Sequence, residues 1–269
     1  MPDPPSWLLV SDMDGTVIPL DQDPGRGEEI RMLSEAIATV PGLTLAYATG
    51  RSLPLATRAV KEFHLPPADS IAVDVGTRIF HRTEQGYTPD ATYDERMTEA
   101  VGGVDLKTVV RALDDVPGLE EQPDWGQGRF KRSYFVDPSV PDDEVMEQVR
   151  ELIEAEGGQV TLVTSHDPVR DLGLLDILPM GIAKDVAVHH LHTLTQTPLD
   201  RVVYAGDSGN DAAAFLAGYA GIVVGNAPDA LKAHLRRAGE EREGGPRLYF
   251  AEAPFAAGVL QGLRHYGVV

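Results

Sequence analysis

The chain has 269 residues, of which 42% are hydrophobic and 24% charged, as is ordinary for a globular protein with one large domain or a core and an insert. Its formal net charge of -19 disfavours binding to nucleic acid or to an anionic membrane surface, because charges of like sign repel. The absence of cysteine excludes disulfides, thiolate metal ligands and cysteine nucleophiles.

The first residues, MPDPPSWLLVSD, lack a basic region followed by a long apolar run, so we expect no signal peptide. No stretch of the chain approaches the ~20 apolar residues that a membrane span needs. We therefore expect a cytoplasmic protein whose excess acidic residues lie on solvated faces, where their charge helps solubility.

The first third of the chain alternates apolar runs with helical patterns. Buried strands are predicted at 7–11, 43–48 and 70–74, with helices at 28–40 and 53–63 between them. A short run at 77–81 reads as a hairpin partner of the third strand. Alternating strands and helices indicate βαβ units, so the predicted fold class is α/β, with a Rossmann-like doubly wound parallel sheet as the core.

The pattern changes in the middle of the chain and later returns. Residues 84–176 contain amphipathic strands near 129–138 and 159–165 and a helix over 142–158 with an acidic first turn. We predict that they form a smaller inserted α+β cap domain, and that residues 1–83 and 177–269 form one discontinuous core. The core pattern resumes with a strand end at 176–179, a helix at 181–194, and strand and helix signals at 202–206, 220–235 and 247–267.

The segment DMDGT begins directly after the first predicted strand. Side-chain alternation along a strand places Asp12 and Asp14 on the same side. Two like charges held this close are costly unless a cation lies between them or one is protonated. Hard oxygen ligands favour magnesium, so Asp12 and Asp14 are predicted metal ligands. The neighbouring Gly15 would let backbone amides approach an anion.

A second acidic loop, GDSGND, follows another apolar strand. At the carboxyl edge of the same parallel sheet, Asp207 and Asp211 could converge with Asp12 on one ion. Asn210 in this loop is a candidate phosphate ligand.

The segment TGRS follows the strand at 43–48 and offers groups that bind phosphate at a strand-to-helix turn. These are the Thr49 hydroxyl, the Gly50 amide and the Arg51 side chain, although Arg51 could equally be an exposed helix residue. Lys184 lies in the first turn of an otherwise apolar helix. The helix dipole disfavours a cation there, so we expect a partner anion for Lys184.

These four motifs, in the order in which they occur along the chain, resemble those of the haloacid dehalogenase superfamily of aspartate-nucleophile phosphotransferases. DMDGT is similar to the first family motif, the segment 49–51 to the second, Lys184 to the third and GDSGND to the fourth. The resemblance covers both halves of the chain, and the insert lies between the second and third motifs, where the superfamily places its larger α/β caps.

The resemblance implies that Asp12 attacks phosphorus to form an aspartyl-phosphate and that Asp14 acts as general acid and base. It implies that Lys184 steadies the nucleophile and the phosphoryl oxygens, while Asp207 and Asp211 hold Mg²⁺. Dehalogenases of the superfamily lack the second acid and its transport ATPases carry threonine there, so Asp14 favours a phosphatase or a mutase.

Several further segments resemble sucrose-phosphate phosphatases and their relatives: VGTRI, RFKRSYFVDP, DLGLLDILPMGIAK and the C-terminal LYFAEAPFAAGVLQGLRHYG. One position departs, because Arg78 stands where those enzymes usually carry glutamate. An arginine there suits a substrate with an additional negative charge, or it forms a surface ion pair. We expect polar residues of the insert to contribute to sugar recognition: Lys131, Arg132, Arg170 and Asp171.

The predicted function is Mg²⁺-dependent hydrolysis of a small-molecule sugar phosphate, sucrose-6-phosphate or a related phosphorylated disaccharide or glycoside, by a phosphoric monoester hydrolase. Mannosylfructose-phosphate and mannosyl- or glucosyl-phosphoglycerate phosphatases stay open, as do a broad hexose-phosphate phosphatase and a phosphomutase. A different class of protein, a catalytically silent regulator that binds a sugar phosphate, is disfavoured because the catalytic residues are all present.

Overall fold

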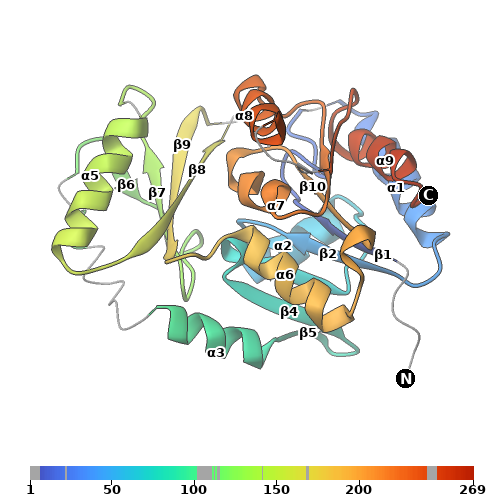
Figure 1. Cartoon of the computed structure of the whole chain (residues 1–269), viewed down its shortest axis with the longest axis horizontal. Coiled ribbons are helices and arrows are strands. Elements are labelled where there is room, and N and C mark those ends of the chain that lie inside the picture. Colours follow the sequence, from blue (N-terminus) through green and yellow to red (C-terminus); the bar gives the residue numbers. More distant parts are fainter. Residues whose placement is uncertain are drawn as a thin grey trace.

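The computed structural model describes residues 7–21, 23–101, 111, 113, 116–140, 142–167, 170–240 and 247–269. The described chain forms two parts, each built on its own β-sheet (Figure 1). The larger part contains both ends of the described chain, and the smaller part is formed by the middle of the sequence. No helix in these described ranges is both long enough and apolar enough to cross a membrane.

The larger part is built on an eight-stranded sheet with the order β12-β11-β10-β1-β2-β3-β4-β5. The strands from β12 to β3 run parallel, and β4 and β5 extend the sheet as an antiparallel hairpin. The strands are β1 (Trp7–Ser11), β2 (Leu43–Ala48), β3 (Ser70–Val73), β4 (Arg78–Thr83), β5 (Gly86–Pro89), β10 (Val202–Gly206), β11 (Ala220–Val223) and β12 (Arg247–Phe250).

Helices cover both faces of this sheet, because successive side chains of each strand point to opposite faces. Leu9 of β1 packs in the cluster formed with α1 (Arg26–Ala38), α2 (Leu53–Glu62) and α9 (Phe255–His265). Leu8 and Val10 pack in the opposite cluster, which holds α3 (Ala91–Ala100), α6 (Lys184–Thr195), α7 (Ala212–Leu216) and α8 (Asp229–Glu240). The predicted doubly wound α/β core is confirmed.

The smaller part is a four-stranded antiparallel sheet of order β6-β7-β9-β8. Its elements are β6 (Leu119–Glu121), β7 (Arg132–Val136), α5 (Asp142–Ala155), β8 (Val160–Asp167) and β9 (Leu172–Pro179). Tyr134 and Leu175 pack with Val149 of α5 on one face of the sheet. Phe135 and Leu174 face the other way and line a cavity toward the larger part. One face therefore holds the small core, and the other is presented to the larger part.

We propose that this smaller part is the inserted cap. The limits expected from the sequence, residues 84–176, need correction, because they divide the β4–β5 hairpin and cut through β9. Helix α3 also belongs to the larger part, since Tyr93 and Met97 are buried in its core. The strand pairing favours cap limits near residues 101 and 180.

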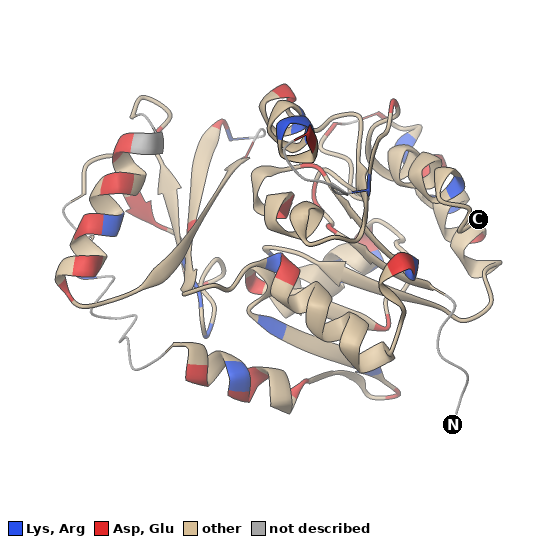
Figure 2. Cartoon of the chain, viewed as in Figure 1, with Lys and Arg blue, Asp and Glu red and all other residues tan. Residues whose placement is uncertain are grey.

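Acidic residues outnumber basic ones along α5 (Figure 2). Exposed glutamates on this helix are Glu144, Glu147, Glu151 and Glu154. Their arrangement agrees with the expectation that excess acid lies on solvated surfaces.

Candidate active site

Three loops of the larger part meet at the carboxyl edge of its sheet. Asp12 follows β1, Thr49 follows β2 and Asp207 follows β10. Strands β2 and β3 lie on one side of β1, whereas β10, β11 and β12 extend the other side, so the strand order switches between β1 and β10. Ligands of doubly wound sheets bind at such a switch point.

Lys184 is the first residue of α6, and its side chain is completely buried. Its Nζ lies 3.0 Å from Asp12 Oδ1 and donates to Asp211 Oδ1 over 2.8 Å. Burial by itself would lower the pKa of this ammonium, but the two carboxylates outweigh burial and raise the pKa above its usual value. Asp12 and Asp211 are thus the partner anions expected for Lys184.

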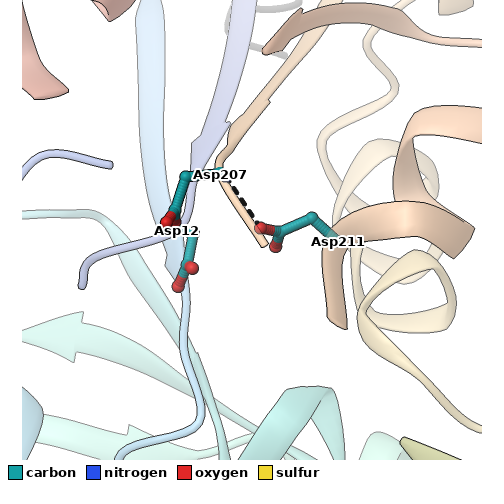
Figure 3. Close-up of side chains that lie close together, drawn as sticks. All are labelled: Asp12, Asp207 and Asp211. Carbon is teal, nitrogen blue, oxygen red and sulfur yellow. Dashed lines mark hydrogen bonds between the residues drawn. The ribbon is translucent and has the colours of Figure 1, made fainter. Parts of the chain in front are cut away.

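Asp12, Asp207 and Asp211 are buried and bring carboxylate oxygens within 4.8 Å of one another. Figure 3 shows these side chains gathered around the loop after β10. Burial raises the pKa of Asp12 well above its usual range, with Lys184 opposing and the neighbouring carboxylates adding to the rise. Burial and the charge of Asp211 raise the pKa of Asp207 to about 7. A divalent cation would offset this repulsion, so the donor set fits an ion that prefers oxygen ligands.

Both oxygens of Asp211 are engaged by protein donors. Oδ1 accepts hydrogen bonds from Lys184 Nζ and, over 2.5 Å, from the Tyr204 hydroxyl. Oδ2 accepts from the backbone N–H groups of Asp207 at 3.0 Å and Ser208 at 2.9 Å. Asp211 therefore fixes the shape of the acidic loop.

Asp207 and Asp12 keep one oxygen each for another partner. Asp207 Oδ1 accepts from the Thr16 hydroxyl at 2.9 Å, and Asp12 Oδ1 accepts from the Met13 N–H at 2.7 Å. No described residue donates to either Oδ2. We infer that Asp12 and Asp207 present the open carboxylate oxygens of the cluster.

Gly15 is required for a reason that the sequence did not reveal. Its φ is +76°, and a Cβ at this position would lie 2.2 Å from Asp207 Oδ2. The expectation that its amide faces an anion needs correction, since the Gly15 N–H donates to the Ile18 carbonyl at 2.9 Å. The residue makes room for Asp207 in the acidic cluster.

Replacing Gly15 by alanine is expected to weaken metal binding and lower kcat/KM about 10- to 100-fold, because Asp207 must move. Titration of activity with MgCl₂ measures the effect. Gly27→Ala is the matched control, since a Cβ there meets nothing within 4 Å. Equal Mg²⁺ dependence of wild type and Gly15→Ala would contradict this role.

Asp14 lies outside the acidic cluster and pairs with Arg51. Arg51 donates to it through Nε at 2.7 Å and Nη2 at 2.6 Å. The Asp14 side chain is 40% exposed. The expectation that the Asp14 carboxylate joins the metal ligands is therefore corrected: within the described chain, the cluster consists of Asp12, Asp207 and Asp211.

The turn after β2 presents polar groups beside this pair. Thr49 is buried, and its Oγ1 accepts from the Arg51 N–H at 3.1 Å. The Gly50 N–H donates to no described residue. The Gly50 carbonyl accepts from Lys131 Nζ of the smaller part at 3.2 Å. The two parts of the molecule therefore touch at the predicted phosphate-binding turn.

A cavity of about 660 Å³ lies between the two parts. The larger part lines it with polar residues at the acidic cluster, among them Asp12, Asp14, Gly50, Arg51, Asp207 and Asn210. The smaller part lines it with residues that include Gln122, Trp125, Lys131, Phe135, Arg170 and Asp176.

The residues expected to read a sugar divide into two groups. Lys131 and Arg170 line the cavity. Arg132 instead donates to backbone carbonyls of its own loop, and Asp171 is exposed and lies 3.3 Å from His166. The structure therefore does not bring Arg132 and Asp171 into the cavity.

Arg78 also lies outside the cavity wall. Its guanidinium donates to both carboxylate oxygens of Asp94, at 3.1 Å and 2.9 Å, and packs over the Phe80 ring. Of the two readings of this position, the ion pair agrees with the structure.

Sequence reasoning missed several residues that support the site. Thr16 belongs to DMDGT but received no role, and Tyr204 looks like an ordinary strand residue. Asp176 lies 3.3 Å from Lys131 Nζ, and alternation along β9 could have placed it opposite the buried face. Trp125 carried no signal beyond its residue type.

Asp74 is a buried carboxyl at the contact between the two parts. Its φ is +53°, Oδ1 has no hydrogen-bond partner, and a Cβ on Gly128 would lie 2.9 Å from its carboxyl group. Burial raises the pKa of Asp74 to about 6, despite the opposing charges of Lys131 and Arg78.

Asp74→Asn is expected to stabilise the fold at pH 8 by about 3 kcal/mol, with the gain vanishing near pH 4. The unfolded carboxyl ionises near its usual pKa of 3.8 and the folded one near 6, so wild-type stability falls as the pH rises through that window and stays low above it. Urea unfolding at several pH values measures the difference. A stability difference between wild type and Asp74→Asn that does not change with pH would contradict the raised pKa of Asp74 in the folded protein.

Comparisons with known proteins agree with this geometry. The family model for sucrose-6F-phosphate phosphohydrolase matches residues 5–267. A HAD-like hydrolase of Nitrosococcus oceani is 31% identical, with 96% of this chain and 71% of that protein covered. The mannosylfructose-phosphate phosphatase of Agrobacterium fabrum is 29% identical, with 98% of each chain covered.

A solved structure is also similar over the whole described fold. The sucrose-phosphatase of Synechocystis sp. PCC6803, solved in complex with sucrose and phosphate, matches with a TM-score of 0.82, 26% identity and 98% coverage of each chain. The resemblance to haloacid dehalogenase phosphatases is confirmed, and the chain belongs to the sucrose-6F-phosphate phosphohydrolase family.

Proposed function

We propose that this chain is a Mg²⁺-dependent phosphatase that hydrolyses sucrose-6-phosphate or a related phosphorylated disaccharide or glycoside. The observation that carries the proposal is the buried Asp12–Lys184 pair at the polar end of a cavity that the cap covers. Its volume of about 660 Å³ lies in the ~300–1,000 Å³ range of small-molecule sites. The names of the Agrobacterium and Synechocystis proteins support a phosphorylated disaccharide.

Asp12 is the proposed nucleophile. One of its carboxylate oxygens attacks phosphorus, and the bond between phosphorus and the sugar oxygen breaks. Asp14 gives a proton to the departing sugar oxygen. It then takes a proton from the water that attacks phosphorus, while the bond between phosphorus and the Asp12 oxygen breaks and inorganic phosphate leaves. Its contact with Arg51 holds this carboxylate at the mouth of the site.

The remaining groups neutralise charge on the transferred phosphoryl oxygens. Lys184, the Gly50 N–H and Arg51 are the proposed donors, and the Asn210 amide faces the same cavity. Mg²⁺ would be held by Asp12 and Asp207, with Asp211 ordering the loop. When bound, the ion offsets the negative charge of the phosphoryl oxygens and of the acidic cluster.

The proposal is tested by assaying phosphate release from a substrate panel with MgCl₂ and with EDTA. The panel contains sucrose-6-phosphate, mannosylfructose phosphate, glucosyl- and mannosyl-phosphoglycerate, and glucose 6-phosphate, each with and without a hexose bisphosphate activator. We expect the highest kcat/KM for a phosphorylated disaccharide, dependent on Mg²⁺ and independent of the activator. Release that is absent from all substrates, or highest for the hexose phosphate, would reject the proposal.

A further inference from the structure

Tyr204 is a buried residue of β10 whose hydroxyl reaches the acidic cluster. It is completely buried in the core, where its ring packs edge-on against Phe215 of α7 at a centroid distance of 5.4 Å. The hydroxyl donates to Asp211 Oδ1 over 2.5 Å. Burial and the neighbouring carboxylates raise the pKa of this hydroxyl well above its usual value, so it remains a proton donor at neutral pH. Tyr204 is not part of the cavity wall, so it contacts the cluster from within the core.

The carboxylate oxygen that accepts from Tyr204 also accepts from Lys184. The Lys184 Nζ lies 2.8 Å from Asp211 Oδ1 and 3.0 Å from Asp12 Oδ1. The four side chains therefore form a chain of contacts from the core to the proposed nucleophile, and every member is buried. Charges and dipoles act strongly on one another at such a place, because little water is present to screen them.

The Tyr204 hydroxyl is in a position to control how strongly Asp211 attracts Lys184. Its O–H dipole offsets part of the negative charge on Asp211 Oδ1 and holds that oxygen in place. Without the hydroxyl, Lys184 would be the sole described donor to Oδ1 and would be drawn toward Asp211, away from Asp12. Asp211 Oδ2 would keep its two backbone N–H donors, so the acidic loop would keep its shape. Loss of the hydroxyl should therefore alter the position of the ammonium more than the fold.

We propose that Tyr204 is a positioning residue whose hydroxyl, by holding Asp211, keeps Lys184 shared between Asp211 and Asp12. In this shared position the ammonium lies beside the carboxylate that attacks phosphorus and can contact the transferred phosphoryl group. Tyr204 acts through these neighbours and does not itself touch the substrate. The inference rests on the proposed function, because it assumes that Asp12 accepts a phosphoryl group.

Tyr204→Phe removes the hydroxyl oxygen alone and keeps the ring that packs on Phe215. We expect kcat for the best substrate of the panel to fall about tenfold or more, while KM changes less than about twofold, because the cavity wall is unchanged. Tyr47→Phe is the matched control: the buried Tyr47 donates its hydroxyl to the Pro66 carbonyl at 3.0 Å, outside the site, and kcat should stay as in wild type. Equal kcat values for Tyr204→Phe and wild type, or equal losses in the two tyrosine variants, would overturn the proposal.

A double-mutant cycle shows whether Tyr204 acts through Lys184. In Lys184→Ala there is no ammonium to position, so adding Tyr204→Phe should lower kcat by less than about twofold further. A further loss as large as the one that Tyr204→Phe causes alone would mean that the hydroxyl acts by another route, which contradicts the proposal. Thermal unfolding in MgCl₂ shows whether each variant is folded.

Nuclear magnetic resonance of ¹⁵N-labelled lysine side chains tests the positioning without catalysis. The chain has five lysines, and the signal of Lys184 is the one missing from Lys184→Ala. We expect Tyr204→Phe to shift this ammonium signal and Tyr47→Phe to leave it in place. A Lys184 signal that Tyr204→Phe does not shift would refute the positioning role. Wild type that releases phosphate from no substrate of the panel rejects the proposed function instead, and the ammonium signal still decides the role of Tyr204.

Discussion

Asp12→Asn is expected to reduce phosphate release about 10⁴-fold or more, because an amide cannot attack phosphorus to form the aspartyl-phosphate. Asparagine has nearly the same shape, so the Met13 N–H and Lys184 keep a side-chain oxygen to contact. The measurement is kcat in MgCl₂ with the best substrate of the panel, alongside thermal unfolding to show that the variant is folded.

A carboxylate outside the site provides the comparison for this variant. Asp21 pairs with Arg26 at the surface, and Asp21→Asn should leave kcat unchanged. A folded Asp12→Asn protein that retained more than about 1% of wild-type activity would exclude Asp12 as the nucleophile.

Lys184→Ala is expected to lower both stability and activity. The lysine lies between Asp12 and Asp211, and its removal leaves buried carboxylates without their positive partner. Breaking a buried pair in this way costs about 3–5 kcal/mol. We also expect kcat to fall about 10³-fold, since a positive charge next to the phosphoryl group is lost. Urea unfolding and steady-state kinetics measure the two effects.

Metal binding provides an internal check on this second variant. MgCl₂ should restore part of the lost stability, because the ion supplies positive charge to the same carboxylates, while kcat stays low. Lys61→Ala, at an exposed position of α2, should change neither property. Unfolding of Lys184→Ala that matches wild type in EDTA would show that the pair does not stabilise the fold.

The fold and the centre of the site follow closely from the sequence. Apolar runs that end in acidic or hydroxyl residues predicted that Asp12, Thr49 and Asp207 each directly follow a strand. Since parallel strands end at one edge of a sheet, these residues could be expected to meet without knowledge of distances. Lys184 was predicted from a different signal, the helix dipole, because a cation in the first turn of a helix needs a partner anion.

Contacts between distant residues were not predictable in this way. The sequence spacing of Asp12 and Asp14 indicated a shared ion, but Asp14 pairs with Arg51 and lies outside the cluster of buried carboxylates. The close approach of Gly15 to the Asp207 carboxylate also depends on how β1 and β10 pair. Spacing within one loop carries no information about such neighbours.

The cap was harder to predict for two physical reasons. The β4–β5 hairpin lacks the βαβ rhythm of the core, so the pattern alone assigned β5 to the insert although it pairs with β4. Polar residue type also does not reveal side-chain direction. Arg132 and Asp171 satisfy contacts within their own loops, whereas the aromatic Trp125 lines the cavity.

The role of Asp12 as the nucleophile is tested most directly by trapping the covalent intermediate. Rapid acid quenching during turnover of a phosphorylated disaccharide with Mg²⁺, followed by mass spectrometry of peptides, is expected to find a phosphoryl group on Asp12. The adduct should be absent from Asp12→Asn. Turnover by wild type with no phosphorylated peptide, or with the phosphoryl group on another residue, would show that Asp12 is not the nucleophile.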